Sequence, residues 1–279
     1  MGSYVVTGAS SGIGAAIAAA LDSRGHDVYA GVRNDDAAAA LVERSSSRVV
    51  PLRLDVTDAD QVAEAAALVR SQVGRYGLDG LVNNAGIALG GPVEFLPLEE
   101  WRDQFEVNVF GQVAVTQGLM APLRSARGRI VFIGSVAGMV SAPFGAPYGA
   151  SKHAIAAVAQ SLRTEVAPWR ISVSLVEPGA VGTEIWVKGS ETVGRIKELV
   201  GEQAMSLYGP AVERLDSEIA KLADAAPGPE KAVAATTHAL FDPRPRPRYA
   251  AGMDARAVAL GVRFLPERVL TRLLERNPA

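Results

Sequence analysis

The sequence predicts an α/β fold, in which helices cover both faces of an open, doubly wound parallel sheet in three α/β/α layers. Short apolar runs rich in β-branched residues alternate with longer segments of helical periodicity, which is typical of right-handed βαβ units. The chain has 279 residues, and 48% of them are hydrophobic. This length suits one large domain as well as two small ones, and the composition supplies a substantial core.

The predicted sheet has about seven strands, and helical patterns lie between most of them. The β-rich runs are 4–8, 26–32, 49–55, 79–85, 128–135, 170–178 and, as a candidate seventh, 247–252. The helical patterns include 13–24, 58–73, 98–124 and 151–167. The Pro/Arg stretch 242–249 is interpreted as an ordered turn into the last strand, with a mobile connection as the alternative. A domain boundary there would leave too little chain for a second core, so a single domain over residues 1–279 is expected.

Composition and charge exclude several classes of function. The formal net charge is −2 and no run of lysine and arginine dominates, which argues against nucleic acid as a partner. There is no cysteine, so thiol chemistry is excluded. The three histidines, His26, His153 and His238, are far apart and lack metal-ligand spacing, so no metal site is expected. The N-terminus has no signal-peptide pattern and no apolar run approaches about 18 residues, so a cytoplasmic protein is expected.

A glycine-rich turn, TGASSGIG at 7–14, lies between the first predicted strand and the first predicted helix. Glycine removes side chains where the backbone must turn tightly, and the helix N-terminus presents unpaired N–H groups to a phosphate. The spacing G-x-x-x-G-x-G differs from the G-x-G-x-x-G fingerprint, and no Lys-Ser/Thr follows, which argues against a P-loop NTPase. Its position at the start of a doubly wound sheet favours a nucleotide site. The residues expected there are Gly8, Ser10, Ser11, Gly12, Ile13 and Gly14.

The end of the second predicted strand, AGVRN at 30–34, bears on the choice of cofactor. An NAD site places Asp or Glu there for the ribose 2′-hydroxyl, whereas this chain has Val32 and Arg33. An arginine can pair with a 2′-phosphate, so NADP(H) is favoured and NAD(H) is the alternative. The other interpretation of Arg33 is an exposed side chain without a ligand. Asp35 and Asp36 lie past the strand end and are expected at the surface.

Tyr148 and Lys152 are four residues apart, which places them on one face of a helix. The ordinary pKa of a tyrosine is about 10, and a nearby ammonium group lowers it. Together with Ser135 upstream, the pair is a candidate site of proton transfer. The same spacing also arises by chance, as a half-buried tyrosine beside a solvated lysine, so the pair alone does not establish chemistry.

Seven motifs in order along the chain resemble those of the short-chain dehydrogenase/reductase family. They are TGASSGIG at 7–14, LDVTD at 54–58, NNAG at 83–86, NVFG at 108–111, Ser135, YGASK at 148–152 and PGAVGT at 178–183. The resemblance is strong over roughly residues 3–185 and loose over the rest. It implies a Rossmann-type fold in a single domain and an NAD(P)-dependent oxidoreductase acting on alcohol and carbonyl groups.

The resemblance also implies a role for each matching residue. Ser135 would donate a hydrogen bond to the substrate oxygen, Tyr148 would exchange a proton with it, and Lys152 would lower the tyrosine pKa and bind the nicotinamide ribose. Asn108 would anchor a water near the lysine, and the alternative is an amide bonded to nearby backbone. The implied cofactor contacts are Asp55 and Val56 with the adenine, Asn83, Ala85 and Gly86 on the ribose side, and Pro178, Gly179, Val181 and Thr183 at the nicotinamide end, in addition to Tyr148 and Lys152. For Asp55 the alternative is a cap or turn residue.

Segment 184–225 follows the PG motif, where members of this family select their substrates. Apolar residues at helical spacing in 191–200 predict a helix that covers an apolar pocket, and a stripe packed on the core is the alternative. With Met139, Val140 and Phe144 as further walls, the pocket favours an apolar ketone or aldehyde and its alcohol, of steroid-, retinoid-, lipid- or polyketide-like character. One alternative is an acyl-carrier ketoreductase, for which a basic cluster near the site is missing. Another is a non-catalytic NADP(H)-sensing protein, although all four catalytic positions are present.

The C-terminal stretch 253–276 mixes arginines with apolar residues at helical spacing. Such a pattern can bind a membrane surface, but it more often packs on its own domain or on a partner subunit. The predicted helix 151–167 is rich in small residues, which let another helix approach closely, and relatives in this family pair through this region. A homodimer or homotetramer is therefore expected, with a monomer as the alternative.

Overall fold

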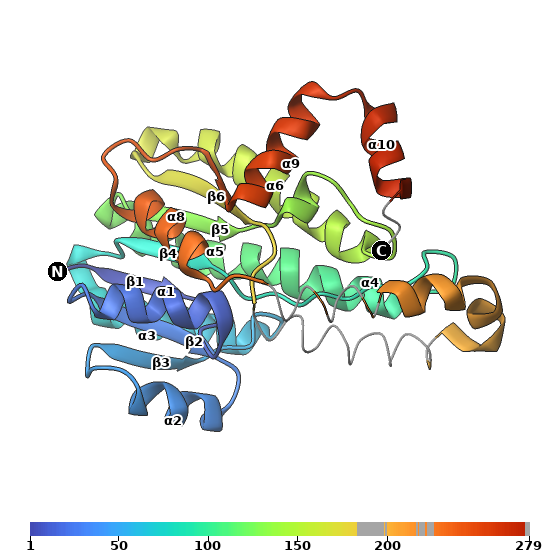
Figure 1. Ribbon diagram of the computed structural model, residues 1–279. Coiled ribbons are helices and arrows are strands. Elements are labelled where there is room, and N and C mark those ends of the chain that lie inside the picture. The colour runs from blue at the N-terminus through green and yellow to red at the C-terminus, as the bar shows by residue number, and fades with distance from the viewer. Residues whose placement is uncertain (183–197, 199, 216, 218–220, 222–225, 277–279) are drawn as a thin grey trace.

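The computed structural model describes residues 1–182, 198, 200–215, 217, 221 and 226–276 (Figure 1). A seven-stranded sheet runs through its centre in the order β3-β2-β1-β4-β5-β6-β7, and every neighbouring pair is parallel. The strands are β1 (Ser3–Val6), β2 (Asp27–Val32), β3 (Val49–Arg53), β4 (Gly80–Asn83), β5 (Arg129–Ile133), β6 (Ser172–Pro178) and β7 (Arg248–Ala251). All seven predicted strands are confirmed, including the candidate seventh.

The strand order reverses between β1 and β4. From β1 the chain moves outward to β2 and β3, returns to β4 beside β1, and then moves outward again through β5 to β7. In open doubly wound sheets, ligands bind beyond the carboxyl ends of the strands at this reversal. The loops that follow Val6 and Asn83 therefore mark where a site should lie.

Helices cover both faces of this sheet, as predicted (Figure 1). The described helices are α1 (Gly12–Asp22), α2 (Asp35–Glu43), α3 (Ala59–Val73), α4 (Leu98–Phe105), α5 (Gln112–Ala126), α6 (Ala146–Glu165), α8 (Glu230–Phe241), α9 (Met253–Phe264) and α10 (Glu267–Arg276). The short turns are η1 (Gly74–Tyr76), the π-helical η2 (Glu106–Gly111), η3 (Val136–Gly138) and η4 (Ala167–Trp169). Residues 200–215 are also helical.

Two apolar cores lie on the two faces of the sheet because side chains alternate along each strand. Val5 points into a core that also contains Val69 of α3 and Leu119 of α5. Its neighbour Val6 points into the other core, which contains Ile17 of α1 and Leu240 of α8. The sheet is thus buried between two helical layers, which explains why its strands read as almost continuous apolar runs.

Three helices differ from the sequence-based prediction. No helix was predicted at α2, where the Asn34 side chain accepts a hydrogen bond from the N–H of Ala37 at 2.9 Å and so caps the first turn. The single helix predicted over 98–124 consists of α4, the π-helical η2 and α5 in succession. The helix predicted over 151–167 begins earlier, at Ala146 with Pro147 in its first turn, so Tyr148 lies inside it.

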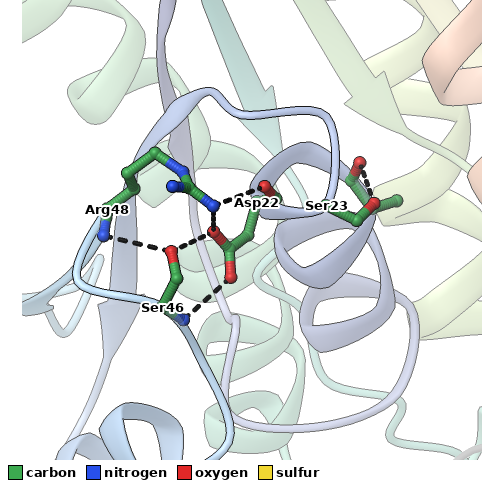
Figure 2. Close-up of polar contacts among 5 residues, drawn as sticks. Asp22, Ser23, Ser46 and Arg48 are labelled. Atoms are coloured by element: carbon green, nitrogen blue, oxygen red, sulfur yellow. Dashed lines mark hydrogen bonds and ion pairs between the residues drawn. The ribbon is translucent and has the colours of Figure 1, made fainter.

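A polar cluster ties the end of α1 to the loop before β3 (Figure 2). The Asp22 carboxylate accepts hydrogen bonds from the Ser46 N–H at 2.9 Å, from the Ser46 hydroxyl and from Arg48 Nη2 at 3.0 Å. These bonds hold the pKa of Asp22 below its ordinary value, and those from Ser46 contribute most. The cluster fixes the edge of the sheet farthest from β7.

The C-terminal helices pack differently from the rest of the chain. α9 contacts β7 and η3, and α10 contacts α9. Phe264 is 70% exposed and Leu273 is 52% exposed, so part of this apolar surface faces outward. Within the described residues no helix is long and apolar enough to cross a membrane. The membrane surface and the partner subunit both stay predictions for this region, as does the homo-oligomer predicted from the small residues of α6.

Candidate active site

The glycine loop is built so that a side chain would not fit at several positions. Gly8 and Gly12 have φ of +63° and +57°, a region that favours glycine. A Cβ at Gly14 would lie 2.2 Å from the Gly8 carbonyl oxygen, so only glycine allows this close packing. Ser11 is the N-cap residue of α1, and its side chain makes no cap hydrogen bond. The N–H groups of the first turn of α1 therefore remain available to an anion.

The remaining predicted residues of this loop are placed around the same turn. Ser10 is exposed, and its carbonyl accepts a hydrogen bond from Arg44 Nη2 at 2.8 Å. Ile13 is half-buried and packs against the core under α1. The loop is thus anchored to the protein on one side, while Ser10 and the start of α1 face outward.

Thr7 and Asn84 join the glycine loop to the loop after β4. The Thr7 hydroxyl oxygen accepts hydrogen bonds from the N–H groups of Asn84 and Ala85, both at 2.9 Å. In return, Asn84 Nδ2 donates to the carbonyl oxygens of Thr7 at 2.9 Å and Gly8 at 3.0 Å. Both residues lie inside motifs that the sequence analysis quoted, yet neither received a role. Together they fix the two loops side by side at the strand-order reversal.

Arg33 lies at the end of β2 and is exposed. It has no hydrogen-bond or ion-pair partner in the part of the chain that the structure describes. Asp35 and Asp36, in the first turn of α2, are also exposed, as expected, and Asp35 faces Arg53 at 3.6 Å. Arg33 is therefore free to meet a ligand at the edge of the glycine loop.

The structure buries the side chains of Asn83 and Val56 and places Asp55 in a turn. Asn83 is fully buried and donates from Nδ2 to the hydroxyl of Thr116 in α5 at 2.8 Å, so its side chain points into the core. The Val56 side chain is also buried, against Gly111 of η2. Asp55 accepts from the N–H and hydroxyl of Thr57 at 2.9 and 2.7 Å, which is the turn role considered as its alternative. A cofactor could meet Asn83 and Val56 only through their backbone.

Three buried amide side chains, Gln104, Asn108 and Gln112, hold the loop after β4 in place. Gln104 accepts from the N–H of Leu89 and donates to the carbonyl of Ile87, both at 2.7 Å. Asn108 bonds both backbone groups of Ile87, accepting from its N–H at 2.8 Å and donating to its carbonyl at 2.9 Å. Gln112 donates to the carbonyl of residue 85 at 2.9 Å.

We call Gln104, Asn108 and Gln112 the amide clamp, and the sequence analysis named only one of the three. Asn108 was expected as a site residue, and its alternative, an amide bonded to nearby backbone, describes what its side chain does. Gln104 and Gln112 were missed, although three amides spaced four residues apart in a predicted helix are a readable signal of a polar stripe. Asn108 also donates to the Ser151 hydroxyl at 3.0 Å, and that hydroxyl donates to the Tyr148 carbonyl at 2.8 Å. The clamp therefore reaches the first turn of α6.

The structure brings together the four predicted catalytic residues. Lys152 is 4% exposed, donates from Nζ to the carbonyl of Ile133 at 2.9 Å, and lies 5.6 Å from the centroid of the Tyr148 ring. A Cβ at Gly86 would lie 3.2 Å from Asn108 Oδ1 and 3.7 Å from Lys152 Nζ, which places the NNAG loop against both. Ser135 lies just after β5 and is the N-cap residue of η3. Its hydroxyl oxygen accepts a hydrogen bond from the N–H of Ala137 at 3.1 Å.

Burial governs the ionisation of the central pair. Burial raises the pKa of Tyr148 above its ordinary value, and a hydrogen bond with Ser135 acts in the opposite direction. The same burial lowers the pKa of Lys152 to about 8. The lowering contribution to the pKa of Tyr148 comes from Ser135, while Lys152 Nζ donates to the Ile133 carbonyl, so the expectation that the lysine ammonium also lowers this pKa stays a prediction.

The PG motif closes the site from the β6 side. Pro178 is the last residue of β6, and a Cβ at Gly179 would lie only 1.7 Å from Asp254 Oδ2. The same carboxylate oxygen accepts from the N–H of Ala180 at 2.8 Å. Val181 is buried. Asp254, in the first turn of α9, was missed by the sequence analysis, and Thr183 lies outside the described residues, as does most of segment 184–225.

Comparison with known proteins identifies the family. A family model described as short chain dehydrogenase matches residues 3–194. The chain belongs to the short-chain dehydrogenase family. This short-chain dehydrogenase is 32% identical over 278 residues to the NADPH-dependent 3-dehydrocapnine reductase of Ornithobacterium rhinotracheale. The alignment covers 98% of this chain and 96% of that protein. It is 35% identical over 283 residues to 17-beta-hydroxysteroid dehydrogenase type 6 of Bos taurus, with coverage of 98% and 87%.

A solved structure supports the same conclusion. The short chain dehydrogenase of Burkholderia cenocepacia, in complex with NADP, is 28% identical and superposes with a TM-score of 0.76 over 98% of this chain and 97% of that one. The resemblance stated from the motifs is therefore confirmed, and so is the fold class. The short-chain dehydrogenase is an oxidoreductase that acts on alcohol and carbonyl groups.

Proposed function

We propose that this short-chain dehydrogenase interconverts an apolar ketone or aldehyde and its alcohol, with NADP(H) as the hydride carrier and Tyr148 as the acid/base. The observation that carries this proposal is the convergence of half-buried Tyr148 with buried Ser135, Lys152 and Asn108 at the carboxyl ends of β4 and β5. Such a convergence of titratable groups at the strand ends is typical of active sites in doubly wound folds.

The glycine loop fits the diphosphate of a dinucleotide. The packing of Gly14 against Gly8 leaves bare backbone at the start of α1, and the first-turn N–H groups there have no side-chain cap. Arg33 would hold the 2′-phosphate, since it is exposed beside this loop and the nearby acidic residues belong to α2. When bound, NADP(H) supplies the hydride for reduction or accepts it in oxidation. The relative in complex with NADP and the NADPH-dependent reductase support NADP(H), and a solved short chain dehydrogenase in complex with NAD keeps NAD(H) as the alternative.

The proton is handled by the chain itself. In reduction, the phenol of Tyr148 gives its proton to the substrate oxygen while Ser135 donates a hydrogen bond to the same atom. The Lys152 ammonium, 5.6 Å from the ring centroid, stabilises the phenolate that this transfer leaves behind. In oxidation the phenolate takes the alcohol proton. Because burial keeps Tyr148 protonated at neutral pH, the resting site is prepared for reduction.

An apolar substrate is supported by the surroundings of the site. Val200 and Ala204 of the helix at 200–215 form a small apolar cluster with Phe95 and Met205, next to the loop after β4. The reductase and hydroxysteroid dehydrogenase relatives are named for carbonyl and alcohol substrates, the second of them a steroid. A steroid-, retinoid-, lipid- or polyketide-like body attached to the reacting group fits these observations.

The proposal is tested by turnover. The purified protein with NADPH or NADH is given a panel of ketones and aldehydes that ranges from cyclohexanone to steroid ketones and retinal, and oxidation of the reduced cofactor is followed. Tyr148→Phe is expected to reduce turnover by about 10²-fold or more and to leave NADPH affinity nearly unchanged. Tyr76→Phe is the matched control, because this tyrosine is 75% exposed and bonds only to Arg75 among the described residues. Binding of cofactor without turnover of any substrate would support the sensing alternative, and full activity of Tyr148→Phe would refute the assigned role.

A further inference from the structure

Phe144 is the point where three loops beyond the carboxyl ends of the sheet meet. Its carbonyl accepts a hydrogen bond from the N–H of Gly91, in the loop after β4, at 2.7 Å. Its ring meets that of Tyr208, in the helix at 200–215 after β6, edge to face with centroids 6.2 Å apart. Phe144 itself belongs to the loop after β5 and precedes Tyr148 by four residues. It therefore joins the loop that leads into Tyr148 to the loop after β4 and to the helix at 200–215.

The backbone of Phe144 is held in a conformation that a bulky residue rarely adopts. Its φ is +61°, and the N–H of Gly145 donates to the carbonyl of Ala142 at 3.1 Å, which closes a four-residue turn. With Pro143 second and a positive φ third, this is the arrangement of a type II turn, whose third position ordinarily takes Gly or Asn. The other described non-glycine residues with positive φ, Arg127 and Arg170, are both helix C-caps, where this conformation is common.

The surroundings leave Phe144 no room to relax. A Cβ at Gly90 would lie 2.6 Å from the Phe144 carbonyl oxygen, so the two loops touch through backbone. The Gly90 loop is fixed in turn by Gln104, which bonds Leu89. Strained residues that the surrounding structure over-determines cluster at functional sites. Because glycine would satisfy this turn without strain, the presence of phenylalanine calls for a role of the ring.

Tyr208 supplies the second ring of the wall and is itself anchored. Its hydroxyl donates to Glu94 Oε2 at 2.9 Å, and its ring meets Phe95 at 6.0 Å between centroids. Phe144 and Tyr208 are both half-buried, so each keeps part of its surface accessible. Aromatic rings bind flat apolar groups through large contact area and offset or edge-on geometry.

We propose that Phe144 and Tyr208 form an aromatic wall that selects substrates carrying a ring system or another extended apolar body, and that this contact is why Phe144 occupies a strained turn. The inference rests on the proposed function, since it concerns the substrate of that site. It assigns the selection to two named side chains, one in the loop after β5 and one in the helix at 200–215, and not to the catalytic residues.

The test compares kcat/KM for a steroid ketone with kcat/KM for cyclohexanone, both with NADPH. Phe144→Gly removes the ring and suits the turn, so it is expected to fold, to lower the steroid-to-cyclohexanone ratio about 10-fold or more, and to do so mainly through KM for the steroid. Tyr208→Ala removes the second ring of the wall and should lower the same ratio. Tyr208→Phe keeps the ring and should keep the ratio.

Phe241→Leu is the matched control. Phe241 is also half-buried in an aromatic cluster, with Tyr4 and His26, but it belongs to α8, away from the loops around Phe144. It should leave the ratio within about twofold. A wild-type enzyme that reduces both ketones, with a ratio that neither Phe144→Gly nor Tyr208→Ala changes, would overturn the aromatic wall alone. A wild-type protein that reduces no ketone of the panel would overturn the proposed function and the wall with it.

Discussion

Replacing Gln104 tests whether the amide clamp positions the loop after β4. Gln104 is fully buried and makes two bonds of 2.7 Å, one to the N–H of Leu89 and one to the carbonyl of Ile87. Gln104→Leu deletes both bonds at similar volume. The Ile87 carbonyl keeps the bond from Asn108 at 2.9 Å, so the N–H of Leu89 is the group that loses its partner.

The expected loss of stability follows from the number of buried groups that lose a partner. A buried polar group left without a partner costs about 1–3 kcal/mol, so Gln104→Leu should destabilise the fold by that amount. Gln104→Glu should cost more at pH 7, because it either places an unpaired carboxylate in a fully buried site or must take up a proton to restore the donor to Ile87. Gln112→Leu also leaves one group short of a bond, the residue 85 carbonyl, but it should cost less because it removes an Oε1 atom that already has no partner among the described residues.

Two assays read out this order. Chemical denaturation of the three variants gives the free energies of unfolding, and steady-state kinetics of Gln104→Leu gives kcat and KM separately. We expect KM for the substrate to rise more than kcat falls, because the loop from Ile87 to Gly91 supports Phe144 while the catalytic residues keep their own bonds. Equal destabilisation by Gln104→Leu and Gln112→Leu, or a Gln104→Glu variant as stable as the wild type, would refute the reasoning.

Two further predictions concern the cofactor and the sheet edge. Arg33→Ala should weaken NADPH binding about 10-fold or more and leave NADH binding nearly unchanged, as measured by fluorescence titration; equal losses for both cofactors would contradict a phosphate-reading role. Asp22→Asn keeps the shape of the cluster in Figure 2 but removes its charge, and should cost about 1 kcal/mol at pH 7. Because the folded pKa of Asp22 is depressed, this contribution is complete above its ordinary pKa and is lost as pH falls through the folded value. Melting temperatures of the two proteins should therefore differ at pH 7 and converge as the pH falls well below the ordinary pKa of aspartate, and a difference that persists there would show that charge is not its source.

The sheet could be predicted from sequence because each strand carries its own signal. Apolar runs bounded by glycine, proline or a helical pattern gave all seven strands, and their alternation with helices gave the parallel order. α2 was missed although its signal was readable, because Asn34 is a typical N-cap, two acidic residues follow it and its four alanines favour a helix. The π-helical η2 escaped because the change in helical pitch at Asn108 has no periodic signature.

Candidate site residues could be named from the sequence where residue type and spacing indicate a chemical role. They were missed where the role depends on a partner far along the chain. Tyr148 and Lys152 can be recognised by their residue types and their spacing of four. Asp254 cannot be recognised in this way, because it accepts a hydrogen bond from the N–H of Ala180, which lies 74 residues earlier in the chain. The orientation of the Asn83 side chain could not be predicted for the same reason, since its partner Thr116 lies in α5 and turns the amide into the core.

The pH dependence of the two reaction directions tests the ionisation of the central pair. Burial raises the pKa of Tyr148, so the phenol needed for reduction persists through neutral pH, and the phenolate needed for oxidation forms only in alkaline solution. Burial also lowers the pKa of Lys152 to about 8, so the ammonium that stabilises the phenolate is lost in part above that pH. We therefore expect kcat for reduction to stay nearly level from about pH 6 to 8 and then fall, while kcat for oxidation rises with pH over the same range. Profiles of both directions with one ketone–alcohol pair would measure this. An oxidation rate that peaks below pH 7 would mean that the phenolate forms easily, and that a bound cofactor or substrate reverses the effect of burial on Tyr148.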